Sequence, residues 1–150
     1  MNRWKRRWIW LRRRSLTDFA LAAEAMVALA VSRIAVVALK FKTYSAYLDS
    51  GAQDREPDPE VLRRVGRAVD IVANLVPWRA MCLESAVAAK WMLRRRGIRT
   101  TLHLGVALKD KFQAHAWLTH GQTTITGGRT GIDWTHLAAF GSEPGREQTQ

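Results

Sequence analysis

Cys82, the only cysteine of the 150-residue chain, stands in the first turn of an expected helix. Free N–H groups and the positive dipole end of a helix stabilise a thiolate at this position. The same N–H groups can receive the oxyanion of a tetrahedral intermediate, so Cys82 is a candidate nucleophile. The alternative is structural, because a lone cysteine among small apolar residues is often a buried hydrophobic side chain.

His115 is the candidate general base for this thiol. It lies in an alternating stretch that is typical of a strand, on the same face as Trp117 and Thr119. A base needs hydrogen-bond reach to the thiol and not proximity in sequence. A helix that carries Cys82 and packs against this strand would supply that reach. The alternative is a histidine with a structural or surface role.

The other histidines are rival candidates for the base: His103, His120 and His136. A metal site built from Cys82, His115 and His120 is conceivable. Its spacing matches no usual zinc pattern, so we expect no metal. No cofactor motif accompanies these residues.

The elements that must position these residues fall into two groups. Apolar residues at helical spacing, with Ser15 and Asp58 as N-caps and Gly97 after the last helix, predict three helices at residues 15–41, 58–76 and 80–96. Alternating residues then predict three strands at 101–108, 114–120 and 123–126. Helices followed by a short antiparallel meander predict an α+β fold.

Length and composition predict a single domain. Nearly half of the residues are apolar (47%), which is enough for a buried core. We expect a basic N-terminal segment at residues 1–14, one folded domain at 15–140 and a frayed tail at 141–150. A lone cysteine cannot form an intramolecular disulfide and suits a reducing compartment, which favours the cytoplasm.

The net charge of +11 fits three kinds of partner: nucleic acid, an anionic membrane surface, or an acidic peptide or protein. No recognisable nucleic-acid-binding module is present, so nucleic acid is not expected. The apolar stretch 19–39 is long enough to span a membrane, but Glu24 and Arg33 oppose insertion. Contact of the basic, tryptophan-bearing segment 1–14 with a membrane surface stays open.

Several short motifs lie between about residues 75 and 140. They are Pro77-Trp78-Arg79-Ala80-Met81-Cys82-Leu83-Glu84-Ser85-Ala86, Leu93-Arg94-Arg95-Arg96-Gly97, Leu104-Gly105-Val106, Phe112-Gln113-Ala114-His115-Ala116-Trp117 and, more loosely, Trp134-Thr135-His136-Leu137-Ala138-Ala139-Phe140. These motifs resemble those of the lasso-peptide leader peptidases, transglutaminase-like maturation proteins related to the C-terminal domain of microcin-processing enzymes. The specific part is the spacing from Cys82 to His115-Ala116-Trp117.

The resemblance implies a papain/transglutaminase-like fold and a cysteine peptidase. Cys82 would be the nucleophile and His115 the general base and then acid. Such proteins remove the leader from a ribosomally made precursor peptide through a thioester. They work beside a small leader-recognition protein and an ATP-using cyclase that closes the lasso ring.

The chain departs from the family at the third catalytic position. The family's acidic residue falls about a dozen positions after the histidine, where this chain reads Thr126-Gly127-Gly128. Asp133 is the nearest downstream acid and is the tentative third member. Thr126 or a backbone carbonyl is the alternative group that orients His115.

The missing acid leaves open a second interpretation of the whole chain. A catalytically weak or inactive member of the same fold would act as a scaffold that holds the precursor or the cyclase. The two tryptophans near the candidate pair, Trp78 and Trp117, either wall a substrate cleft or pack in the core.

Overall fold

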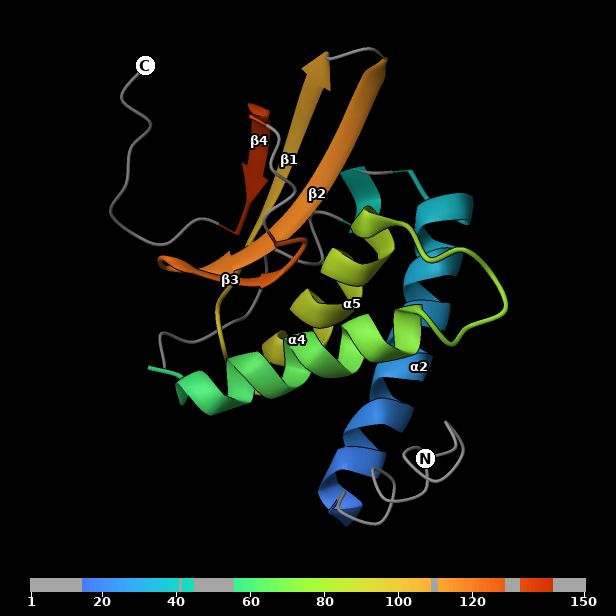
Figure 1. Cartoon of the computed structure of the whole chain (residues 1–150), viewed down its shortest axis with the longest axis vertical. Coiled ribbons are helices and arrows are strands. Elements are labelled where there is room, and N and C mark those ends of the chain that lie inside the picture. Colours follow the sequence, from blue (N-terminus) through green and yellow to red (C-terminus); the bar gives the residue numbers. More distant parts are fainter. Residues whose placement is uncertain (1–14, 41, 45–55, 109–110, 129–132, 142–150) are drawn as a thin grey trace, which may run out of the picture.

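The computed structural model describes residues 15–40, 42–44, 56–108, 111–128 and 133–141. Within this part of the chain, helices come first and a four-stranded antiparallel sheet follows, which confirms the predicted α+β class (Figure 1). The elements are α2 (Leu16–Ala38), α4 (Pro59–Ala73), α5 (Cys82–Arg94), β1 (Thr101–Leu108), β2 (Phe112–His120), β3 (Thr123–Thr126) and β4 (Thr135–Phe140).

The helices begin at the caps that the sequence predicts. The Ser15 hydroxyl accepts a hydrogen bond from the N–H of Thr17 at 3.4 Å, and Asp58 accepts one from the N–H of Glu60 at 2.9 Å. These side chains satisfy backbone donors that have no partner within the helix. Gly97 follows α5 with a φ of 73°, the left-handed conformation expected after a helix end.

Two predicted helix boundaries differ from the structure by two or three residues. Helix α4 ends at Ala73 and not next to Pro77, because the chain already forms turns at Asn74 and Leu75. Proline also disfavours helical conformation at the residue before it. Helix α5 begins at Cys82 and not at Ala80, so the thiol occupies the first helical position.

The sheet has the strand order β3-β2-β1-β4. The first three strands form the predicted meander, with Gly105 of β1 opposite His115 of β2. Strand β4 pairs with the other side of β1, where Leu104 lies opposite Ala138. The sequence analysis missed this strand because Leu137-Ala138-Ala139 carries no alternation of polar and apolar residues.

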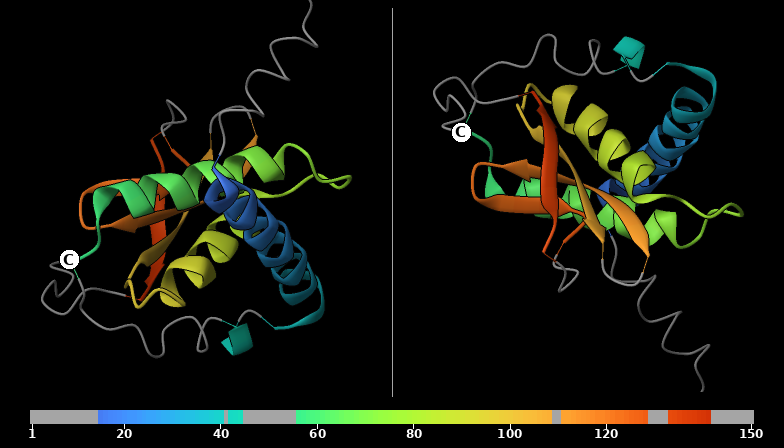
Figure 2. Two further views of the ribbon diagram at one scale, coloured as in Figure 1. Left: turned by 90° about the horizontal axis from the view of Figure 1, so that it is seen from below. Right: turned by 90° about the horizontal axis from the view of Figure 1, so that it is seen from above.

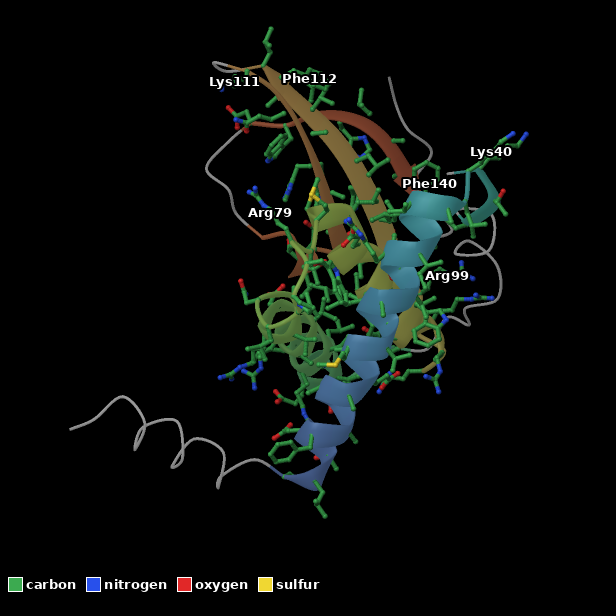
Figure 3. The ribbon with its side chains drawn as sticks, turned by 90° about the vertical axis from the view of Figure 1, so that its right-hand side faces the viewer. Lys40, Arg79, Arg99, Lys111, Phe112 and Phe140 are labelled. Atoms are coloured by element: carbon green, nitrogen blue, oxygen red, sulfur yellow. The ribbon has the colours of Figure 1, made fainter. Side chains whose placement is uncertain are left out.

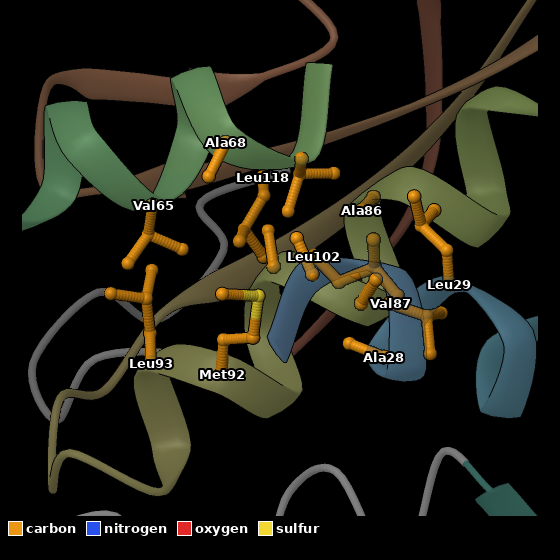
Figure 4. Packing of buried hydrophobic residues seen from close by; sticks show 14 of the residues in the cluster. Ala28, Leu29, Val65, Ala68, Ala86, Val87, Met92, Leu93, Leu102 and Leu118 are labelled. Carbon is orange, nitrogen blue, oxygen red and sulfur yellow. The ribbon is translucent and has the colours of Figure 1, made fainter. Parts of the chain in front are cut away.

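Helices α4 and α5 cover one face of the sheet, α2 packs against these two helices, and the core lies among the helices and the sheet (Figure 2). Leu102 and Leu118 contribute fully buried side chains from the sheet (Figure 4). The helices contribute Ala28 and Leu29 from α2, Val65 and Ala68 from α4, and Ala86, Val87, Met92 and Leu93 from α5. Alternation along β2 therefore directs Ala116 and Leu118 toward the helices and His115 and Trp117 to the other face.

Candidate active site

Cys82 is the first residue of α5, and its side chain is half-buried against the edge of the core. The N–H groups at this end of the helix have no carbonyl partner one turn earlier. The N–H of the N-cap residue Met81 has a side-chain partner instead, because it donates to Oε2 of Glu84 at 3.3 Å. The thiol therefore lies beside unpaired backbone donors, as thiolate and oxyanion stabilisation both require.

Glu84 connects this helix start to α2. Its side chain is buried, with 1% exposed, and Oε1 accepts a hydrogen bond from Nη1 of Arg33 at 2.7 Å. The carboxylate thus bonds the residue before Cys82 with one oxygen and α2 with the other. The sequence analysis missed this role, although an acid in the first turn of a helix is a recognisable signal.

Replacement of Arg33 by methionine is expected to lower the free energy of unfolding by about 1–2 kcal/mol, because the buried Glu84 carboxylate loses its charged partner. The effect stays moderate since the Arg33 side chain is 43% exposed and water can reach the site. Urea unfolding measures it. The control is Arg63→Met, which breaks the exposed Arg63–Glu60 pair and should cost under about 0.5 kcal/mol. Equal losses in both variants would contradict a special role for the buried pair.

His115 is held by a backbone carbonyl. Its Nε2 lies 3.0 Å from the carbonyl oxygen of Gly127, in the turn that follows β3. A carbonyl oxygen can only accept, so Nε2 carries the hydrogen and donates it. In the neutral ring the lone pair is then on Nδ1, which makes that nitrogen the basic one.

Glycine is the residue type that fits at position 127. Its φ is 73°, and an added Cβ would lie 2.6 Å from the carbonyl oxygen of Ala116 and 2.8 Å from Cβ of Trp117. Both observations exclude a side chain without movement of β2. In the sequence, Gly127 stands in the stretch where the family's acid falls, about a dozen residues after His115, and a backbone carbonyl is one of the alternatives for orienting the imidazole.

Aromatic rings enclose the imidazole of His115. The Trp134 ring stacks on it with centroids 4.9 Å apart, and the Trp117 ring lies 6.0 Å away at an interplanar angle of 19°. Trp134 belonged to the loosest part of the motif match, and the sequence analysis gave it no role.

A second group of polar rings continues along the same face. His103 stacks on Trp117 with centroids 5.3 Å apart, and its two ring nitrogens lie 3.0 Å from Nε2 of His136 and 2.9 Å from Oγ1 of Thr119. Burial lowers the pKa of His103, and the charges of His136 and Lys90 lower it further. The contacts of His103 and its lowered pKa favour the neutral form of the imidazole.

Cys82 and His115 lie on neighbouring elements, but no hydrogen bond joins them in the described residues. Helix α5 packs against β2, so the elements that carry Cys82 and His115 are neighbours (Figure 1), but the alternation of β2 places the His115 side chain on the face of the sheet away from the helices. In the described part of the chain, no hydrogen bond joins Cys82 Sγ to His115, whose recorded partner is Gly127. Catalytic hydrogen bonds are often long in the absence of substrate and tighten on binding, so the pair stays a prediction.

Within the described residues, neither Asp133 nor Trp78 forms a hydrogen bond or ring contact with His115. Asp133 is exposed, and among the described residues it makes no hydrogen bond or ion pair, although its neighbour Trp134 stacks on His115. Trp78 packs against the core, and its Nε1 is buried without a hydrogen-bond partner. The third-member role of Asp133 and the cleft role of Trp78 stay predictions.

Within the described ranges, no group of three or more His, Cys, Asp or Glu residues is placed to hold a metal ion. His120, the third residue of the conceivable metal set, donates from Nδ1 to the Arg99 carbonyl at 2.7 Å. It also lies on the opposite face of β2 from His115, because the two are five residues apart along a strand.

Comparison with protein-family models supplies the family. The model described as Transglutaminase-like superfamily matches residues 25–138, well over half of the chain. The chain belongs to the transglutaminase-like superfamily. No curated protein and no solved structure matched the chain. The superfamily match runs from Ala25 within α2 to Ala138 within β4, and therefore includes both Cys82 and His115. A transglutaminase-like domain is a fold suited to cysteine peptidase-type chemistry.

Proposed function

We propose that this transglutaminase-like protein is a cysteine peptidase that removes the leader from a ribosomally made lasso-peptide precursor. The observation that carries the proposal is the state of His115. The Gly127 carbonyl holds Nε2 as a donor and leaves Nδ1 as a free base, on a strand beside the helix that begins at Cys82. The motif resemblance around both residues supports the choice of the precursor.

In the first step, Nδ1 of His115 takes the proton of the Cys82 thiol. The helix start favours the resulting thiolate, because the unpaired N–H groups and the dipole end of α5 carry partial positive charge. The imidazolium keeps its hydrogen bond from Nε2 to the Gly127 carbonyl. A carbonyl dipole fixes the tautomer as a carboxylate would, but stabilises the positive ring less.

In the second step, the thiolate attacks the carbonyl carbon of the last leader residue. Backbone N–H groups at the start of α5 receive the oxyanion. His115 then gives its proton to the leaving amine, and a thioester joins the leader to Cys82. Water, deprotonated by His115, hydrolyses the thioester and frees the leader.

The partners follow from the same proposal. The precursor peptide is the substrate, a small leader-recognition protein presents it, and an ATP-using cyclase takes over the released core peptide. The chemistry needs no metal or cofactor, since thiol, imidazole and backbone donors complete each step.

The test is mass spectrometry of the candidate precursor after incubation with the protein and its leader-binding partner. Wild type and Cys82→Ala are compared side by side. Cleavage at one site by wild type alone is the expected result. Cleavage by both proteins would remove Cys82 from the mechanism.

A scaffold without activity is the second candidate. Two observations favour it: no carboxylate is recorded at His115, and no hydrogen bond joins it to Cys82 in the described residues. The same experiment separates the candidates. A precursor that stays intact but bound to the wild-type protein would identify the scaffold.

A further inference from the structure

Helix α2 presents an apolar face that nothing in the described part of the chain covers. It packs against α4 and α5 with Ala25, Ala28 and Leu29, whereas most of its other large apolar side chains are exposed. In Figure 3, α2 runs along the near side of the molecule. The outward residues, called the α2 stripe below, are Leu16, Phe19, Met26, Val27, Val31, Ile34 and Val37, each 48–88% exposed.

The stripe contains no charged residue. The helix has three charged side chains, and each one forms an ion pair. Asp18 pairs with Arg64 of α4 at 2.7 Å, Glu24 pairs with Arg96, just after α5, at 2.6 Å, and Arg33 pairs with Glu84 of α5 at 2.7 Å. The charged groups of α2 are therefore all paired, and the stripe itself is free of groups that resist transfer from water.

The stripe is long as well as apolar. The helix has 23 residues, which corresponds to about 35 Å, and the stripe residues share one side of it. The exposed residues Ala20 and Ala23 continue this side between Phe19 and Met26. Scattered exposed apolar residues are ordinary on protein surfaces, but a continuous strip of this length marks an interaction surface.

We propose that the α2 stripe docks on an anionic membrane surface. The charge of the chain argues for this occupant. Seven of the 14 residues that lead into α2 are Arg or Lys, with Trp4, Trp8 and Trp10 among them, and the whole chain carries +11. Basic residues attract anionic lipid headgroups, and tryptophan favours the membrane interface. The basic segment directly precedes the α2 stripe in the sequence, so a single anionic membrane surface can bind both.

The helix lies along the membrane and does not cross it. By length and composition, α2 is the one helix in the described ranges that could span a bilayer, with 22% of the relevant window buried. Spanning would break the ion pairs of Asp18, Glu24 and Arg33 and expose the core contacts of α2. Docking in the plane buries the stripe and keeps every one of these contacts.

The experiment is flotation of the full-length chain with vesicles. Vesicles of 70% phosphatidylcholine and 30% phosphatidylglycerol are compared with pure phosphatidylcholine. The test variant is Val27→Glu/Ile34→Glu, at positions 56% and 65% exposed, and the matched control is Leu108→Glu, 81% exposed at the end of β1. Circular dichroism and thermal unfolding establish that the variants fold.

We expect wild type and Leu108→Glu to bind the anionic vesicles alike and the double variant to bind at least tenfold more weakly. Binding should fall at 0.5 M salt and in pure phosphatidylcholine. Equal binding by the double variant, or no binding by wild type, would overturn the proposal. A wild-type dimer that the double variant converts to monomer, without vesicle binding, would assign the stripe to a second copy instead. The Cys82→Ala protein should bind like wild type, so this result is independent of the proposed peptidase activity.

Discussion

Replacement of His115 by glutamine is expected to lower the rate of leader cleavage at least about 1,000-fold, because the variant loses the base that activates Cys82. Glutamine suits the test, since its Nε2 can still donate to the Gly127 carbonyl as the imidazole does. What it lacks is the basic nitrogen at the position of Nδ1. The measurement is single-turnover cleavage of the precursor by mass spectrometry.

A second readout separates a catalytic role of His115 from a structural one. The rate at which iodoacetamide alkylates Cys82, followed against pH, reports the thiolate. Loss of the His115 base should slow the alkylation of Cys82 at neutral pH, because no imidazole takes the thiol proton. The control is His120→Gln, because His120 bonds the Arg99 carbonyl on the opposite face of β2. An unchanged alkylation rate together with an unchanged cleavage rate in His115→Gln would contradict the proposed base.

The parts of the fold that depend on local signals could be predicted from the sequence. The caps at Ser15 and Asp58 and the glycine after α5 are short-range chemistry, and all three lie where the pattern placed them. The alternation along residues 102–126 likewise predicted β1 to β3. A cysteine at the start of a helix and a histidine on a strand also follow from local pattern, so both candidate residues were visible.

Contacts between distant parts of the chain could not be predicted in this way. Strand β4 is held by pairing with β1, and its residues Leu137-Ala138-Ala139 carry no strand signal of their own. The bond between Arg33 and Glu84 joins residues 51 positions apart. The outward orientation of the apolar side of α2 depends on where α4 and α5 pack, which periodicity does not reveal.

The hydrogen-bond partner of His115 is another contact that the sequence pattern could not identify. A search by residue type looks for a carboxylate and finds Asp133, whereas the bond at Nε2 comes from a main-chain oxygen that every residue has. Only the path of the chain after β3 brings that oxygen into reach. A backbone group can be recognised from the sequence only where its position demands a particular residue type. Position 127 is such a case, because it demands glycine.

Replacement of Gly127 by alanine should have the second-largest effect. The new Cβ would meet the Ala116 carbonyl oxygen at 2.6 Å and Trp117 Cβ at 2.8 Å, and the φ of 73° disfavours any L side chain. We expect a loss of about 2–4 kcal/mol in the free energy of unfolding, from the left-handed backbone and the overpacking together. Cleavage should also fall, because relief of the contact moves the carbonyl away from His115. Urea unfolding and single-turnover cleavage measure the two effects.

Gly128→Ala is the matched control, since a Cβ at Gly128 would meet nothing within 4 Å. The two variants add the same methyl group to adjacent glycines, so general effects of glycine replacement cancel. Gly128→Ala should keep both stability and cleavage. If Gly127→Ala loses stability but cleaves at the wild-type rate under conditions where it is folded, the carbonyl does not orient the base, and Asp133 becomes the group to replace. A parallel loss of cleavage and of the low-pH alkylation of Cys82 would instead place the Gly127 carbonyl in the part that a carboxylate plays in an acid-containing triad.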